Sequence, residues 1–300
     1  MPRISKQTSV LTILFAIIFI IAVNFYYKSH IRNVVLLETP PVPTTKGTNN
    51  RPLGVAITVS FNYKNDPQTH QRIQPTYDYI KPWYESLRRN SKMSGVVIED
   101  TFDTEFRSKY STDQISFVHI NSSKHPAFDD YPNSNERSIN DQRFFVIYWY
   151  ITEFLKDHEY VVLTDSRDVR FLRNPFEFFR GMDRTLGSRQ LYVSEEYEPQ
   201  AHSFVWNHKH WQKCFNEPET STVKMYNPGV IGGRVDVIKT LLSRMLDLFS
   251  RRTPVEEDCN MQVLQKVLRE NFQDNVISGY PLHTKFGANE TNDFAFIKHK

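Results

Sequence analysis

Short apolar runs alternate along the chain with stretches of helical periodicity. The apolar runs are Val55 to Val59, Val96 to Ile98, Ile115 to Ile120, Tyr160 to Leu163, Leu191 to Val193 and Val230-Ile231. The helical patterns cover 76–90, 138–155, 235–250 and 254–269. Strands that alternate with helices are typical of an α/β fold with a largely parallel sheet. We therefore predict an α/β fold in which helices flank a mixed, mostly parallel sheet.

Three of the predicted helices carry further signals. In 235–250 the apolar residues recur every three or four positions, which predicts one buried stripe. Residues 144–151 are apolar on every side, so the helix that Ser138 and Asp141 open must be buried. Thr253-Pro254-Val255-Glu256 has the form of a capping box with proline at the first helical position. It predicts a helix start near Pro254.

The N-terminal part of the chain predicts a membrane anchor. Between Lys6 and Lys28 lie 21 uncharged residues, enough for a helix to span a bilayer core of roughly 30 Å. A cleaved signal peptide is the alternative, but Asn24 to Tyr27 offers no small-x-small cleavage site. We therefore predict a tail at 1–6 and an uncleaved transmembrane helix at 7–27.

The residues after the anchor predict a stem and one large domain on the lumenal side. Residues 28–52 include a Pro/Thr/Asn segment without apolar periodicity, which suits an extended stem. The flanking basic residues do not orient the anchor. The sequons at Asn121 and Asn289, with Cys214 and Cys259, which allow one disulfide, together favour a lumenal location for 53–300.

Charge argues against a nucleic-acid partner. The chain has 37 Lys+Arg against 34 Asp+Glu, a formal net charge of +3, and no basic run of five or more. Neutralising a phosphate polymer requires a clustered positive surface. The 22 Phe, 15 Tyr and 4 Trp residues instead indicate a substantial buried core.

Candidate chemistry follows one strand directly. The run Tyr160 to Thr164 ends in Asp165-Ser166-Arg167-Asp168, and ligands of open α/β sheets bind at the carboxyl ends of the strands. Asp165 and Asp168 can hold a divalent cation that bridges a diphosphate, and Arg167 offers a planar fork for phosphate oxygens. The structural alternative is that either aspartate caps a turn and pairs with a nearby arginine.

At these residues the chain resembles Golgi glycosyltransferases of the GT-A fold. The anchor, the stem, the single α/β domain and the strand that ends in paired aspartates carry the resemblance. It implies that Asp165 and Asp168 bind a nucleotide sugar through Mn²⁺ or Mg²⁺. Three further segments resemble the family in order: Asn227-Pro228-Gly229 beside the sugar, Asp258 facing the donor, and His283 as a third metal ligand. Arg143 resembles a donor-contacting basic residue.

One departure from the family pattern bears on the metal. The family motif has its second aspartate two positions after the first, whereas this chain has Arg167 there and a carboxylate at Asp168. Either the turn brings Asp165 and Asp168 to one cation, or Arg167 itself neutralises the pyrophosphate.

A carboxylate must also deprotonate the acceptor hydroxyl or stabilise the sugar cation. The candidates are Asp258, Glu257, Glu195 and Glu196. Their structural alternatives are a helix first turn for Glu257 and Asp258, and a solvated strand end for Glu195 and Glu196. His283 has the alternative of a surface turn residue.

Other functional classes fit the sequence less well. A sulfotransferase needs a phosphate-binding loop after its first strand, but Phe61-Asn62-Tyr63 stands there. Arg167 breaks the motif of an aspartyl phosphatase. A non-catalytic lumenal binding protein stays open as the alternative. We predict a type II membrane hexosyltransferase of the Golgi, with the endoplasmic reticulum as alternative, that transfers a sugar from a nucleotide donor, a UDP-sugar in particular, to a glycan or glycoprotein.

Overall fold

The computed structural model describes residues 53–67, 69–72, 74, 76–121, 125–187, 189–196, 202–218, 224–285 and 294–299. All of them belong to one unit of the chain, Pro41–Lys300. The predicted tail, anchor and stem, and the sequon at Asn289, lie outside the described residues. Among the residues described, no helix combines the length and the apolar character that crossing a bilayer requires.

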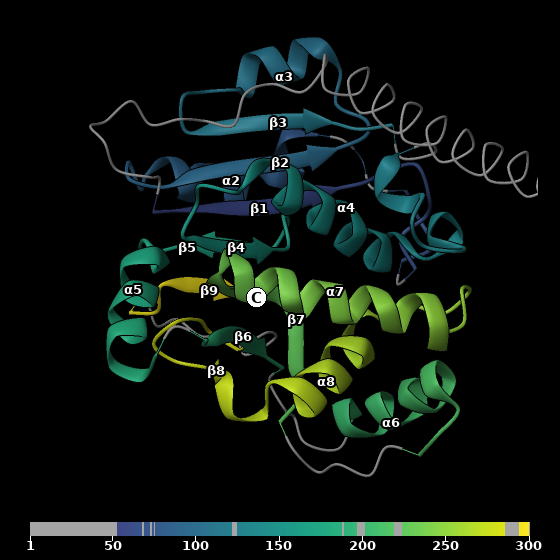
Figure 1. The fold of residues 1–300 in the computed structure, drawn as a ribbon. Helices are drawn as coiled ribbons and strands as arrows, with labels where there is room; N and C mark the ends of the chain where they lie inside the picture. Colours follow the sequence, from purple (N-terminus) through teal and green to yellow (C-terminus); the bar gives the residue numbers. More distant parts are fainter. Residues whose placement is uncertain are drawn as a thin grey trace, which may run out of the picture. The chain divides into compact units, whose positions relative to one another are not determined.

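A seven-stranded sheet with the order β3-β2-β1-β4-β7-β6-β8 forms the centre of this unit (Figure 1). Its strands are β1 (Gly54–Ser60), β2 (Ser94–Glu99), β3 (Ile115–His119), β4 (Tyr160–Thr164), β6 (Leu191–Glu195), β7 (Tyr226–Arg234) and β8 (Val276–Ser278). All neighbouring pairs are parallel except the two that β7 makes with β4 and β6. The prediction of a mixed, mostly parallel sheet is confirmed.

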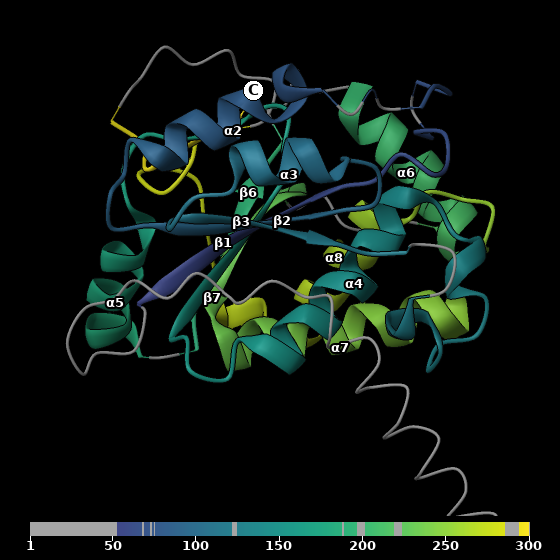
Figure 2. The same cartoon turned by 90° about the horizontal axis from the view of Figure 1, so that it is seen from above.

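Helices cover both faces of this sheet (Figures 1 and 2). They are α2 (Tyr77–Arg88), α3 (Thr104–Tyr110), α4 (Ile139–Phe154), α5 (Pro175–Leu186), α6 (His202–Phe215), α7 (Val235–Arg252) and α8 (Asn260–Asn271). Buried residues of α4, α7 and α8 pack with Val55, Ile57 and Leu163, whereas those of α2 and α5 pack with Ala56 and Val162. Because successive strand residues point to opposite faces, each apolar run supplies both cores.

The predicted helix over 138–155 is confirmed in both its start and its burial. The Ser138 hydroxyl accepts a hydrogen bond from the backbone N–H of Asp141 at 3.1 Å, which caps α4. Most of residues 144–151 are buried, and the remaining two, Tyr148 and Trp149, are partly buried. The helix packs against both the sheet and α7 because it has no polar face to present to water.

The predicted helix start at Pro254 is wrong, because α8 begins at Asn260. The hydroxyl of Thr253 donates to the carbonyl of Phe249 in the last turn of α7, and it accepts from the buried Arg137 at 2.8 Å. Thr253 therefore ends one helix instead of opening the next. Tertiary contacts have overridden a local capping pattern.

A buried histidine gives the fold a dependence on pH. His125 is 4% exposed, its Nδ1 accepts from the backbone N–H of Ala127, and its ring packs edge-on against Trp149. Burial lowers the pKa of His125 to about 4.

The pKa of His125 is lower in the folded than in the unfolded state. Its contribution to the free energy of unfolding is therefore complete above the ordinary pKa of about 6.5 and is lost as the pH falls toward 4. We expect the free energy of unfolding to fall by about 2 kcal/mol between pH 7.5 and pH 5 through this group. Urea titrations at both pH values measure it. His125→Asn keeps an acceptor for Ala127 without a charge, so an equal pH dependence in this variant would contradict the assignment.

Candidate functional site

Two segments that the sequence analysis singled out meet at one edge of the sheet. Asp165 directly follows β4, and Asn227-Pro228-Gly229 lies in the first half of the antiparallel β7, which begins at that same edge. The backbone N–H of Asp165 donates to the carbonyl of Gly229 at 2.9 Å. The reversed direction of β7 therefore brings residues about 60 positions apart in the chain side by side.

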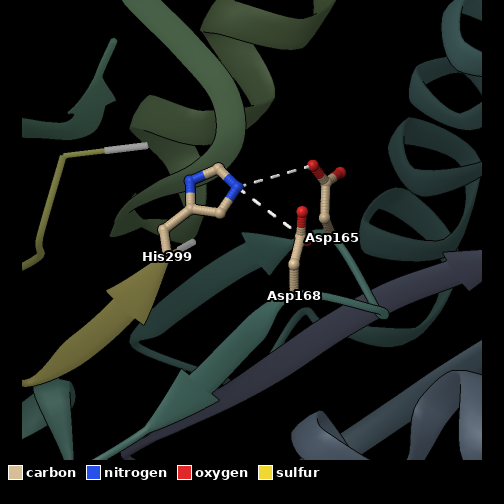
Figure 3. A group of neighbouring side chains, drawn as sticks. All are labelled: Asp165, Asp168 and His299. Atoms are coloured by element: carbon tan, nitrogen blue, oxygen red, sulfur yellow. Dashed lines mark ion pairs between the residues drawn. The ribbon is translucent and has the colours of Figure 1, made fainter. Parts of the chain in front are cut away.

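A third segment completes a group of possible metal ligands (Figure 3). The Nε2 atom of His299 lies 3.8 Å from Oδ2 of Asp165 and 3.9 Å from Oδ1 of Asp168. His299 ends β9 (Ile297–His299), which pairs antiparallel with β5 (Val169–Phe171). Since Val169 pairs directly with His299 and follows Asp168, this small two-stranded sheet sets the histidine beside the aspartates.

Gly229 allows the three side chains to approach one another. A Cβ atom at Gly229 would lie 2.6 Å from Oδ2 of Asp165 and closer still to Cε1 of His299. Both distances are shorter than any ordinary contact, so even alanine would force the histidine or the aspartate to move. Gly229 thus leaves room for the His299 and Asp165 side chains. Its backbone N–H donates a hydrogen bond to Oδ1 of Asn227 at 2.6 Å.

The two aspartates differ in their affinity for protons. Burial opposes the charged form of Asp165, but the adjacent Arg143 guanidinium and His299 together outweigh burial and lower the pKa of that carboxyl. Burial, and then the charge of Asp165, raise the pKa of Asp168 to about 6. Burial lowers the pKa of His299 to about 4, so its ring is neutral at physiological pH. Two acidic groups that repel each other beside a neutral imidazole form a site that a cation would stabilise.

The geometry fits a divalent cation. The carboxylate side chains of Asp165 and Asp168 are each 30% exposed, while the His299 side chain is buried. Ligand atoms about 2.1 Å from one ion lie at most about 4.2 Å apart, and the distances from His299 to each aspartate are inside this limit. The three residues offer one ligand atom each within 4.8 Å of one another, so a small inward movement suffices.

Comparisons with known proteins identify the fold. No protein-family profile matches the sequence, and no curated protein matches it either. Mouse xyloside xylosyltransferase 1 in its apo form superposes with a TM-score of 0.51 at 11% identity, over 82% of this chain and 97% of that one.

The fold is the GT-A fold of glycosyltransferases. The galactosyltransferase LgtC, in a complex with donor and acceptor sugar analogs, matches with a TM-score of 0.48 at 13% identity, over 82% of this chain and 86% of that chain. An active-site mutant of LgtC matches with the same values. At 11% identity the likeness to the xylosyltransferase establishes the arrangement of strands and helices, and the chemistry rests on the residues of this chain.

Within this GT-A fold, His283 lies outside the Asp165, Asp168 and His299 group. Its Nε2 lies 2.6 Å from the carbonyl oxygen of Val193, and the side chain is buried. The neighbouring Thr284 instead contacts the backbone of His299: its hydroxyl donates to the carbonyl of His299 and accepts from the N–H of His299. The segment that resembles the family's metal-binding histidine thus holds the strand that carries His299.

The two basic residues of the prediction occupy different positions. Arg143 forms an ion pair with Asp165, is 17% exposed, and lies over the ring of Phe144. Arg167 is exposed between the two aspartates in sequence and has no ion pair among the described residues. Arg143 therefore orients one carboxylate, while Arg167 is free to meet an anionic ligand.

The adjacent residues Glu195 and Glu196 are separated by their contacts. Glu195 is buried and pairs with Lys224 at 2.9 Å and with Lys285 at 3.3 Å. Glu196 accepts from the Asn227 amide at 2.5 Å. Burial, and also the charge of Asp165, raise the pKa of Glu196, while the Asn227 hydrogen bond opposes them. The pKa of Glu196 therefore depends on the charge of Asp165.

Asp258 and Glu257 lie before α8, not in its first turn, so the helix-dipole alternative for them is wrong. Asp258 accepts hydrogen bonds from Ser138 at 3.1 Å and from the Asn140 amide at 2.9 Å. Glu257 pairs with Lys213 at 3.2 Å. Asp258 therefore borders the N-terminal end of α4, whose Arg143 contacts Asp165, whereas Glu257 faces α6.

Sequence reasoning missed two residues of the site. His299 carries no motif, because it stands in a three-residue strand near the end of the chain. Tyr79, in α2, lies beside Ser166: burial raises its pKa, a hydrogen bond to Ser166 opposes this, and the charge of Asp165 adds to it. No local pattern distinguishes Tyr79 from the other tyrosines of the chain.

Proposed function

We propose that the protein is a glycosyltransferase that uses a nucleotide-sugar donor, in particular a UDP-sugar, and a divalent cation. The observation that carries the proposal is the group formed by Asp165, Asp168 and His299 at the carboxyl edge of a GT-A sheet, with both carboxylates partly exposed. The nature of the ligand atoms favours Mn²⁺ over Mg²⁺, because magnesium prefers oxygen ligands and one of the three atoms is an imidazole nitrogen.

In this proposal Asp165, Asp168 and His299 hold the cation, which supplies positive charge to the diphosphate leaving group. Arg143 keeps Asp165 ionised and fixes the orientation of its carboxylate, and the exposed Arg167 contacts phosphate oxygens. Glu196, with its raised pKa, is the first candidate to accept a proton from the acceptor hydroxyl or to stabilise the sugar cation. Asp258 and Glu257 stay candidates on the acceptor side.

The test is turnover of the donor itself. The full-length chain, in mild detergent, is incubated with a panel of UDP- and GDP-hexoses and pentoses in Mn²⁺, in Mg²⁺ and in EDTA, and the released nucleotide is measured. We expect slow hydrolysis of one donor that Mn²⁺ supports best and EDTA abolishes. If neither nucleotide release nor nucleotide binding occurs with any donor, the proposal is wrong.

We also propose that the chain is a type II membrane protein of the Golgi, with a tail at 1–6, an anchor at 7–27, a stem at 28–52 and a lumenal domain at 53–300. The apolar span of 7–27 and the disulfide between Cys214 and Cys259 support it, because structural disulfides form in oxidising compartments. Glycosidase treatment of protein made in cells should raise its mobility on a gel. No shift, together with protease sensitivity in intact vesicles, would contradict this topology.

His299 gives a direct test of the metal site. We expect His299→Ala to weaken Mn²⁺ binding at least about tenfold, because changes that only surround a metal site already lower affinity by about 10- to 100-fold. Mn²⁺ titration followed by paramagnetic resonance measures binding without any turnover. His119→Ala, which removes a partly exposed imidazole from the end of β3, is the matched control. Equal affinity in His299→Ala and the control would exclude His299 as a ligand.

A further inference from the structure

Helix α6 carries a partly exposed pair of rings that the donor site does not use. The rings of Trp206 and His210 lie 4.1 Å apart, centre to centre, at an angle of 33°. Trp206 is 37% exposed, and its neighbour Val205 is 66% exposed. Residues four apart lie on the same face of a helix, so the two rings form one continuous surface. We call Trp206 and His210 the ring platform.

Charged groups surround the ring platform, but the two rings themselves are uncharged. Burial, and then Lys213, lower the pKa of His210, while Glu257 and Asp258 oppose them. The histidine ring is therefore neutral at physiological pH. Two carboxylates and an amine thus lie within electrostatic reach of an aromatic surface that is itself uncharged.

Three contacts fix α6 to the segment that carries these carboxylates. The disulfide between Cys214 and Cys259 joins the end of α6 to the residue next to Asp258. Lys213 pairs with Glu257 at 3.2 Å. The α6 helix lies beside α8 in both views (Figures 1 and 2), where the buried amide of Gln262 donates to Asn207 at 3.2 Å. The ring platform is consequently held in place before any ligand arrives.

The same segment connects the ring platform to the donor site. Asp258 accepts from the side chain of Asn140 in the first turn of α4. Arg143, which pairs with Asp165, follows Asn140 by three residues, a rise of about 4.5 Å along the helix. A series of interactions thus leads from His210 through Asp258 and the first turn of α4 to Asp165.

We propose that the ring platform, with Glu257 and Asp258, is the binding subsite for a neutral sugar unit of the acceptor. The proposal rests on the proposed function and adds the acceptor class and its location. Aromatic faces pack against the C–H groups of a sugar ring, and carboxylates accept hydrogen bonds from its hydroxyls. Lys213 compensates the charge of Glu257, but Asp258 forms no ion pair among the described residues and would repel a sulfated or sialylated unit, which is why the subsite fits an uncharged sugar.

Trp206→Ala tests the subsite. An array of neutral and acidic oligosaccharides is probed with the full-length chain, and the neutral glycan that binds best then serves as acceptor. In the variant we expect binding to that glycan to fall about tenfold and the acceptor KM to rise about tenfold, while the donor KM stays within about twofold. Trp206→Phe, which keeps an aromatic face, should recover most of the binding.

Phe294→Ala is the matched control, because Phe294 is another exposed aromatic residue, 69% exposed, on a different segment. If no neutral glycan binds the wild-type chain better than Trp206→Ala, the subsite is wrong. The same holds if Trp206→Ala and Phe294→Ala lower acceptor binding equally.

The two proposals fail separately. Donor hydrolysis without any effect of Trp206→Ala on acceptor KM overturns the subsite alone. Glycan binding that depends on Trp206, without binding or turnover of any nucleotide sugar, overturns the transferase and leaves a sugar-binding surface.

Discussion

Replacing Asp165 with Asn, or Asp168 with Asn, is expected to lower the rate of sugar transfer at least about 100-fold, or about 2.7 kcal/mol of activation free energy. Each substitution keeps the size of the side chain but removes a charged oxygen from the group that faces His299. In the proposed mechanism, positive charge on the departing diphosphate would supply much of the rate enhancement, so losing one metal ligand should affect the transition state more than donor binding.

The measurement is kcat/KM for transfer at saturating Mn²⁺, with near-UV circular dichroism to show that each variant is folded. Asp247→Asn is the matched control, because it changes a half-exposed carboxylate that pairs with Arg251 on the surface of α7. We expect this control to keep its activity within about twofold. Turnover close to that of the wild type in both Asp165→Asn and Asp168→Asn would disprove the assigned site.

The two variants should differ in a way that the structure specifies. Asp165→Asn also deprives Arg143, which is only 17% exposed, of its ion-pair partner, so it should lower stability as well as activity. Asp168 has a raised pKa and makes weaker contacts than Asp165 does. Asp168→Asn should therefore leave stability nearly unchanged. If both residues hold one cation, as proposed, the double variant should lose little more activity than either single variant.

The sequence allowed the sheet and one half of the site to be predicted, because both depend on local patterns. Strands buried on two faces are continuous apolar runs, and Tyr160 to Thr164 is such a run with Asp165 directly behind it. The Asn227-Pro228-Gly229 segment was singled out through its resemblance to the family, since by itself this tripeptide indicates only a turn. These features need no knowledge of distant contacts.

The other half of the site depends on contacts between distant residues. His299 reaches the aspartates only because β9 pairs with β5, which lies about 130 positions earlier in the chain. Strands of three residues are too short for a periodic pattern, so neither strand was predicted. His283 was preferred because it had a family-like motif, whereas the structure places it beside Val193.

Helix boundaries show the same limit. The capping pattern at Thr253 predicted a helix start. In the structure, the Thr253 hydroxyl instead donates to the carbonyl of Phe249 and accepts from Arg137. Helix α6 was not predicted, since the polar run from Asn207 to His210 interrupts the helical spacing of its apolar residues. The ring platform on that helix is consequently a feature that only the structure reveals.

Removing the disulfide is the change with the largest expected effect on stability. Cys214 and Cys259 are separated by 45 residues, and closing a loop of that length restricts the unfolded chain by about 4 kcal/mol. Both cysteines are buried in the core formed by α4, α7 and α8. We therefore expect the Cys214→Ala/Cys259→Ala double variant to lose about 4 kcal/mol of unfolding free energy in urea titrations.

The same variant separates the two roles of the disulfide. If it only restricts the unfolded chain, acceptor KM should stay that of the wild type wherever the variant is folded. If it also holds α6 against the segment of Asp258, acceptor KM should rise while donor KM does not, because the contacts that join Arg143, Asp165 and His299 involve neither cysteine. A loss of less than about 1 kcal/mol would show that the packing of α6 on α8, not the covalent link, holds this part of the fold together.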